Sequence, residues 1–205
     1  MKNSQLFFLG MAMMGGTVLI TASTFHLQNY YINTLFVGNP LAYFLGFLIA
    51  TIGLLGGAFA YSISGHISDN IKTKWGKRRP FFFLAIPCGI AFTFTTLPIF
   101  VQNILGFPTN FYAGVFFLII VYTIYIFCWR FVQCPFLTLF VDVTKPEERI
   151  KASVWLNFCD LGGVVIGVLL PLLFQMLGIS NGLEISIFLF GLFYIAAFML
   201  SFILG

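Results

Sequence analysis

Residues 65–80 read Gly-His-Ile-Ser-Asp-Asn-Ile-Lys-Thr-Lys-Trp-Gly-Lys-Arg-Arg-Pro, and they form the strongly charged run of a chain that is otherwise apolar. Five of the ten Lys and Arg residues lie here, together with one acid, Asp69. The segments on both sides are apolar and long enough to cross a bilayer. A short basic loop between two spans predicts that the loop faces the cytoplasm.

The composition excludes a soluble domain of this length. Hydrophobic residues make up 60% of the chain and charged residues 8%, and the mean hydropathy is +1.02. These values are typical of an integral membrane protein. The net charge of +4 comes from the loops, so it favours anionic lipid headgroups and not nucleic acid. The four cysteines lie in apolar segments without C-x-x-C spacing, and we expect neither a metal site nor a cofactor.

We predict one transmembrane domain over residues 1–205, with six helices. They cover about residues 5–32, 41–66, 80–101, 111–140, 152–177 and 184–204. Each reaches the ~20 residues that a ~30 Å hydrocarbon core requires. Nine of the ten Lys and Arg residues fall on one side of this arrangement, and the tenth, Arg130, lies inside a span. Six crossings then place both termini in the cytoplasm, with the protein in the cell membrane.

Two ionisable residues are predicted to lie deep in the bilayer, Arg130 in the fourth helix and Asp160 in the fifth. At 1.5 Å per residue they are about 18 Å and 14 Å from the cytoplasmic edge. Gln133 and Asn157 lie one turn from them on the same helix faces. We therefore expect a cluster of four polar residues near the midplane, on two consecutive antiparallel helices.

This cluster has two interpretations. Charges in the membrane are costly and often mark a substrate or coupling site. The alternative is a buried ion pair between Arg130 and Asp160 that holds two helices together. Trp129 is likewise suited to stacking on a sugar ring or to plain helix packing.

The first helix carries a polar stripe formed by Thr17, Thr21, Thr24 and Gln28, which helical spacing places on one face. Such a face must look at protein or water and not at lipid. It either lines a solute path or packs against another helix. His26 lies off the stripe, as a proton-linked group or as a hydrogen-bonded structural histidine.

Two segments resemble a known family. Gly65-x-x-Ser68-Asp69, Gly76, the cations Lys77, Arg78 and Arg79, and then Pro80 resemble the loop between helices 2 and 3 of the major facilitator superfamily. The ending from Trp75 to Pro80 is similar to the glycoside-pentoside-hexuronide carriers and the plant sucrose transporters. Gln133-Cys134-Pro135, followed by Asp142, Thr144 and Glu147-Glu148-Arg149, resembles the segment that leads into helix 5 of the glycoside carriers.

The resemblance implies an all-α integral membrane bundle of six helices, equivalent to one half of a transporter of that superfamily. It implies a solute carrier that works by alternating access, with a small-molecule substrate at mid-membrane. It also implies that Asp69 and the pair Arg78 and Arg79 form a charged latch at the cytoplasmic ends of helices 2 and 3. Thr17, Gln133 and Asn157 stand where cation-coupled glycoside carriers have an acid, an acid and an arginine. A sodium site is therefore not expected, and Asp160 is the natural carrier of a coupled proton.

The family has two six-helix halves with the substrate path between them. A chain of one half is expected to need a second half, as a homodimer or a separate chain. Proton-coupled sugar or glycoside symport is the leading hypothesis, and a non-transporting fragment or interaction-only membrane protein is the alternative. We predict no enzymatic activity, because the sequence lacks metal-ligand spacing, a Ser/His pair and a phosphate-binding loop.

Overall fold

The computed structural model describes residues 3–71, 73–96, 111–179 and 181–204, and helices account for nearly all of them. A single long helix begins the chain. It consists of α1 (Asn3–Ala22), a π-helical segment (Ser23–Leu27), the short α2 (Gln28–Tyr30) and a second π-helical segment (Tyr31–Leu35). The later helices are α3 (Ala42–Asn70), α4 (Ala85–Phe94), α6 (Phe111–Val143), α7 (Arg149–Met176) and α8 (Gly182–Leu204). Short 3₁₀ segments, Arg79–Leu84 and Pro146–Glu148, lead into α4 and α7.

These helices follow the predicted segments closely. In the described part of the chain, five are long and apolar enough to cross a membrane: Leu6–Asn33, Ala42–Asn70, Ala113–Val143, Pro146–Met176 and Gly182–Ile203. The third predicted helix, 80–101, appears as the shorter apolar segment Arg79–Phe94. Its remaining residues from 97 onward lie outside the described part, so a sixth crossing stays a prediction.

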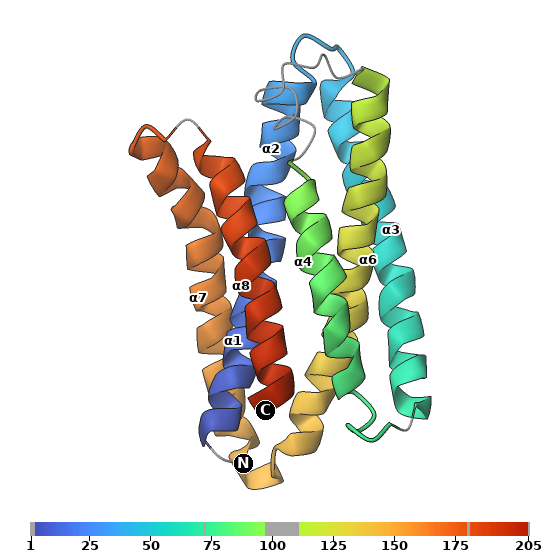
Figure 1. The fold of residues 1–205 in the computed structure, drawn as a ribbon, viewed down its shortest axis with the longest axis vertical. Helices are drawn as coiled ribbons and strands as arrows, with labels where there is room; N and C mark the ends of the chain where they lie inside the picture. Colours follow the sequence, from blue (N-terminus) through green and yellow to red (C-terminus); the bar gives the residue numbers. More distant parts are fainter. Residues whose placement is uncertain (1–2, 72, 97–110, 180, 205) are drawn as a thin grey trace.

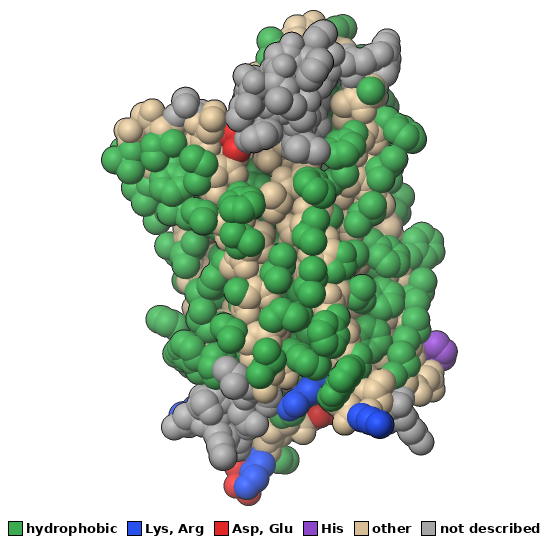
Figure 2. All heavy atoms as spheres, in the orientation of Figure 1, with side chains coloured by type: hydrophobic (Ala, Val, Ile, Leu, Met, Phe, Trp, Pro, Cys, Tyr) green, Lys and Arg blue, Asp and Glu red, His purple; other side chains and the backbone are tan. Residues whose placement is uncertain are grey.

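The helices form two packed groups, joined by α4 (Figure 1). In one group α1 packs on α7 and α8, and in the other α3 packs along α6. The helix α4 contacts both α6 and α8. Both termini lie at the same end of the bundle as the connection between α3 and α4 (Figure 1). Lys and Arg side chains gather at that end on the face drawn in Figure 2, as the basic loop led us to expect.

Aromatic side chains make the core where α6 and α8 meet the 3₁₀ segment that leads into α4. The rings of Phe82 and Phe198 lie 5.4 Å apart, and Phe136 lies 5.6 Å from Phe198. All three are almost completely buried. Edge-to-face contacts of this kind contribute about 0.5–1.5 kcal/mol beyond the burial of their area. This core fixes the position of α6, which carries Arg130.

Two glycines let α7 approach α1 closely. A Cβ added to Gly163 would lie 2.7 Å from the backbone oxygen of Met14, and one added to Gly167 would lie 3.0 Å from that of Val18. Small residues at such crossings allow backbone contact in membrane proteins, where packing drives association. The approach brings Thr17 of α1 against α7.

The neighbouring glycine, Gly162, provides a matched test. Its added Cβ would meet only the Sδ atom of Met14, at 3.5 Å, an ordinary contact with a flexible side chain. We expect Gly163→Ala to destabilise the protein by about 1–3 kcal/mol through overpacking. Gly162→Ala should have little effect. Thermal unfolding in detergent, monitored by gel filtration of the protein that stays folded, measures the stability of both variants. Equal stability of the two variants would contradict the close approach.

Candidate functional site

Arg130 lies on α6 and faces a recess toward α3. Its Nη1 donates a hydrogen bond of 2.8 Å to Oε1 of Gln133, one turn along the same helix. The recess has a volume of about 370 Å³. Its lining residues are Leu54, Gly57, Ala58, Tyr61, Ser62 and Arg130, and the described lining contains no carboxylate. Arg130 is thus a partly buried cation beside an open space.

Gly57 makes room for the arginine. A Cβ at this position would lie 3.0 Å from Cγ of Arg130 and 2.7 Å from Cγ2 of Ile126. A larger residue on α3 would therefore displace the stem of the arginine or separate α3 from α6. Glycine at position 57 leaves the guanidinium facing the recess, whose described lining contains no carboxylate.

Asp160 lies on α7 and is hydrogen-bonded to the hydroxyl of Thr17 on α1 through its Oδ1. The same hydroxyl lies 3.1 Å from the backbone oxygen of Met13. A hydroxyl has one proton to donate and two lone pairs to accept with. Thr17 can therefore donate a hydrogen bond to an ionised Asp160, or donate to the backbone oxygen of Met13 and accept a hydrogen bond from the O–H of a protonated Asp160. The arrangement accommodates both charge states of the carboxyl group.

The predicted cluster of four residues on one hairpin is wrong in its pairing. The helices α6 and α7 follow each other in sequence, but α6 packs mainly on α3 and α4, and α7 on α1 and α8. Arg130 bonds to Gln133, and Asp160 bonds to Thr17. In the described residues no ion pair joins Arg130 and Asp160. Two separate polar sites take the place of one.

The side chain of Asn157 is exposed on α7, one turn from Asp160. The indole ring of Trp129 is buried instead, 5% exposed, and lies 5.9 Å from the ring of Tyr194 in an edge-to-face contact. A Cβ on Gly16 of α1 would lie 2.2 Å from this indole. Trp129 therefore fills the junction of α1, α6 and α8, which is the packing interpretation.

The polar stripe of the first helix divides in two. Thr17 and Thr21 are buried against α7, where an added Cβ at Gly163 or Gly167 would approach their Cβ atoms. Thr24 is exposed and donates to the backbone oxygen of Ile20, and Gln28 is half-buried. Helix packing accounts for Thr17 and Thr21, and Thr17 is also bonded to Asp160.

His26 lies in the first π-helical segment, half-buried. Its Nε2 is 3.2 Å from the backbone oxygen of Val168 on α7. The contact ties the first helix to α7 and fits the structural interpretation of this residue.

Arg78 joins the ends of two helices. Its Nη1 lies 3.0 Å from Oδ2 of Asp142 at the end of α6, and its Nη2 lies 3.5 Å from Oδ1 of Asp69 at the end of α3. We call these three residues the latch. The predicted partnership of Asp69 and Arg78 is present, whereas Asp142 was not predicted as a member. It stands in the segment that resembles the glycoside carriers, but nothing in the sequence shows that it faces Arg78.

The rest of the basic loop shapes this contact. Gly76 has a φ of +94°, which favours glycine, and its amide bonds to the oxygen of Thr73 in a tight turn. Pro80 lies in the first turn of the following 3₁₀ segment, where a missing N–H costs nothing. Gly65 lies close to α6, since an added Cβ would be 3.3 Å from Sγ of Cys134. Lys77 is exposed and Arg79 is half-buried.

Comparison with known proteins gives a family match. The family model described as MFS/sugar transport protein matches residues 8–204, nearly the whole chain. No curated protein matches the chain.

The two polar sites make a prediction about energetic coupling. Thr17→Val and Asp160→Ala should couple by about 0.5–3 kcal/mol, because the two side chains are bonded. Arg130→Gln and Asp160→Ala should add to within about 0.5 kcal/mol, because each has another partner. Thermal unfolding of the single and double variants in detergent gives both cycles. Strong energetic coupling between positions 130 and 160 would contradict these separate partners and support an ion pair between Arg130 and Asp160.

The ion pairs of the latch should slow local opening of the basic loop. Arg78 is 15% exposed, but its partners Asp69 and Asp142 are 68% and 57% exposed, so the ion pairs contribute only about 0–1 kcal/mol. Arg78→Gln should speed tryptic cleavage after Lys74 by roughly two- to fivefold in the purified protein. Arg79→Gln is the charge-matched control and should leave the rate unchanged. The two variants would be cleaved alike if Arg78 held nothing in place.

Proposed function

Because this chain belongs to the major facilitator superfamily, we propose that it is a six-helix half of a solute carrier, which moves a sugar or glycoside together with a proton. The family model that it matches is one of sugar transport proteins, and members of the superfamily move small molecules across membranes by alternating access. The observation that carries the proposal is that Arg130 and Asp160 have different partners and so form two polar sites. One is arranged to donate hydrogen bonds, and the other to hold or release a proton.

Arg130 and Gln133 are the proposed solute-binding pair. Arg130 faces a recess of about 370 Å³ and uses one of its five N–H groups on Gln133. The remaining donors can serve hydroxyl or ring oxygens of a sugar. In the described part of the chain Arg130 has no acidic partner, and an isolated charge in a membrane helix costs at least ~2.5–3.5 kcal/mol by insertion scales, which supports a functional role for it. Tyr61 and Ser62 add hydroxyl groups to the same recess.

Asp160 is the proposed proton carrier. Its bond to Thr17 can reverse direction when the carboxyl group gains a proton, because the hydroxyl can turn to the backbone oxygen of Met13. The neutral acid and the carboxylate then both have a partner in the membrane. Protonation would act through the contact between α1 and α7, which meet at Gly163 and Gly167.

A second half is the proposed partner. In the apolar stretches of the spans Ala42–Asn70 and Pro146–Met176 only 28% is buried, compared with 61% in the first helix. Large apolar side chains such as Phe47, Phe59 and Phe158 are exposed on these two helices. A partner half covering part of this surface, from a second copy, a separate chain or a further segment, would enclose the path that the Arg130 recess faces.

The proposed orientation places both termini and the latch in the cytoplasm. It is supported by the nine Lys and Arg residues assigned to that side. The latch would hold α3 and α6 together in one state of the carrier, because Arg78 joins their ends.

Transport by vesicles tests the proposal. Labelled sucrose and a labelled β-glucuronide serve as probes, with and without an imposed pH gradient. Asp160→Asn keeps an oxygen for Thr17 but cannot carry a proton, so it should abolish gradient-driven accumulation and leave downhill exchange. Arg130→Gln should lower the apparent affinity roughly ten- to hundredfold in both assays, the loss of a hydrogen bond to a charged group.

Glu147→Gln, an exposed carboxylate in the basic end of the molecule, is the control and should behave as the unsubstituted protein. Accumulation by Asp160→Asn equal to the unsubstituted protein would overturn the coupling role. Membranes in which the chain is inserted but neither probe moves, alone or with a co-expressed second half, would favour a non-transporting membrane protein.

A further inference from the structure

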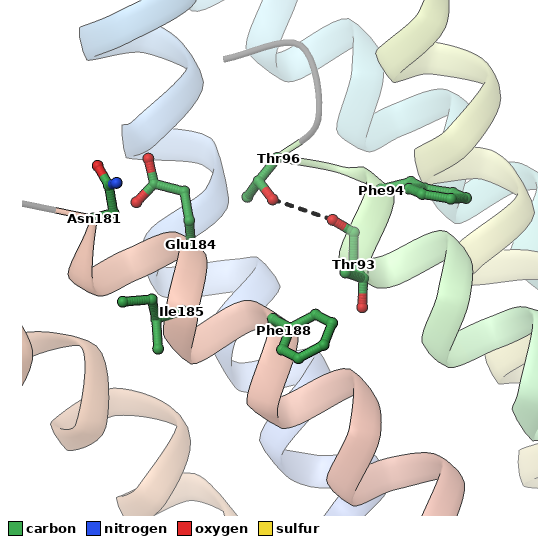
Figure 3. A pocket seen from close by; sticks show the side chains of 7 residues that line it. All are labelled: Thr93, Phe94, Thr96, Asn181, Glu184, Ile185 and Phe188. Carbon is green, nitrogen blue, oxygen red and sulfur yellow. Dashed lines mark hydrogen bonds between the residues drawn. The ribbon is translucent and has the colours of Figure 1, made fainter. Parts of the chain in front are cut away.

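A second cavity lies at the end of the bundle opposite the latch. It has a volume of about 410 Å³ and lies between the last turn of α4 and the first turns of α8. Figure 3 shows Asn181 and Glu184 beside each other at the start of α8, with Thr96 across from them on the α4 side. Phe188 lies one turn further along α8 (Figure 3). The cavity is therefore polar at one end and apolar at the other.

Among the described residues, Tyr30 holds Glu184 in place. The hydroxyl of Tyr30, in the first helix, donates a hydrogen bond to its Oε1. None of the ten Lys and Arg residues lies in the connections that the sequence places at this end, so the chain offers the carboxylate no cation there. The Thr96 hydroxyl is itself directed at the backbone oxygen of Thr93 (Figure 3). A carboxylate in this environment favours a cationic ligand.

The depth of the cavity indicates what kind of cation. Glu184 is in the first turn of α8, which has 23 residues and at 1.5 Å per residue spans slightly more than the ~30 Å hydrocarbon core. The carboxylate therefore lies at the level of the lipid headgroups. Phe188 lies about 6 Å deeper, at the start of the acyl chains. Phe188 and Phe94 are 51% and 46% exposed, so the apolar end of the cavity opens outward to the bilayer.

We propose that this cavity binds a phospholipid with a primary-amine headgroup, phosphatidylethanolamine, from the leaflet on that side. The ammonium group would donate to the carboxylate of Glu184 and to the amide oxygen of Asn181. The upper part of an acyl chain would lie against Phe94, Ile185 and Phe188. A quaternary ammonium has no N–H to donate, so phosphatidylcholine with the same acyl chains is the matched comparison. Lipid binding at this site requires insertion in a membrane and does not require transport.

Native mass spectrometry of the purified full chain tests this. The protein is mixed with dioleoyl phosphatidylethanolamine and dioleoyl phosphatidylcholine in equal amounts, and the retained lipid is counted. We expect a preference of about three- to tenfold for the ethanolamine lipid, because the choline lipid keeps the positive charge and loses only the N–H donation. Equal retention of the two lipids would overturn the proposal without the need for any variant.

Glu184→Gln then locates the site. Glutamine keeps an oxygen that Tyr30 can donate to, so the fold is preserved while the charge is lost. The preference should fall to near unity in this variant and stay unchanged in Glu147→Gln, at the other end of the molecule. A preference that survives Glu184→Gln would place the lipid elsewhere.

Glycerophosphoethanolamine, which has the headgroup but no acyl chains, separates a lipid from a soluble cation. It should displace the bound lipid only weakly, since the apolar end of the cavity would stay empty. Displacement at a concentration equal to that of the lipid would make this a site for soluble amines and would overturn the lipid assignment.

Discussion

A polar group inside a bilayer must face protein or water and not lipid, and the helix contacts of this chain depend on that constraint. Asp160 meets it through Thr17, which is possible only because Gly163 and Gly167 let α1 and α7 touch. Arg130 meets it through Gln133, beside the space left by Gly57. The glycines at the helix contacts thus determine which polar side chains can meet.

The helices were predictable because the membrane makes hydrophobicity a sufficient signal. Ala42–Asn70 and Gly182–Leu204 agree with the predicted 41–66 and 184–204 to within four residues. The polar stripe of the first helix was not predictable, because its spacing assumed a uniform α-helix. A π-helical turn contains an extra residue and rotates the next part of the helix about its axis. Thr24 is in such a turn, and it is exposed while Thr17 and Thr21 are buried.

The sequence predicts a depth for Arg130 and Asp160 from the rise per residue, and that depth stays a prediction, whereas the predicted pairing of the two was wrong. Which helices pack together is decided by tertiary contacts, and these separate α6 from α7. The latch shows the same limit: Asp69 and Arg78 are near in sequence, whereas Asp142 reaches Arg78 only because α3 packs along α6.

The two π-helical segments of the first helix also affect how this chain is compared with others. A wide turn is equivalent to a one-residue insertion that leaves the helix unbroken. A relative with a regular helix over the same depth would be one residue shorter across Ser23–Leu27, and again across Tyr31–Leu35. Matching such sequences without a gap would align His26 or Tyr30 with residues that face other directions. Equivalent positions beyond Ala22 are therefore identified by their contacts with α7 and α8, and not by counting along the chain.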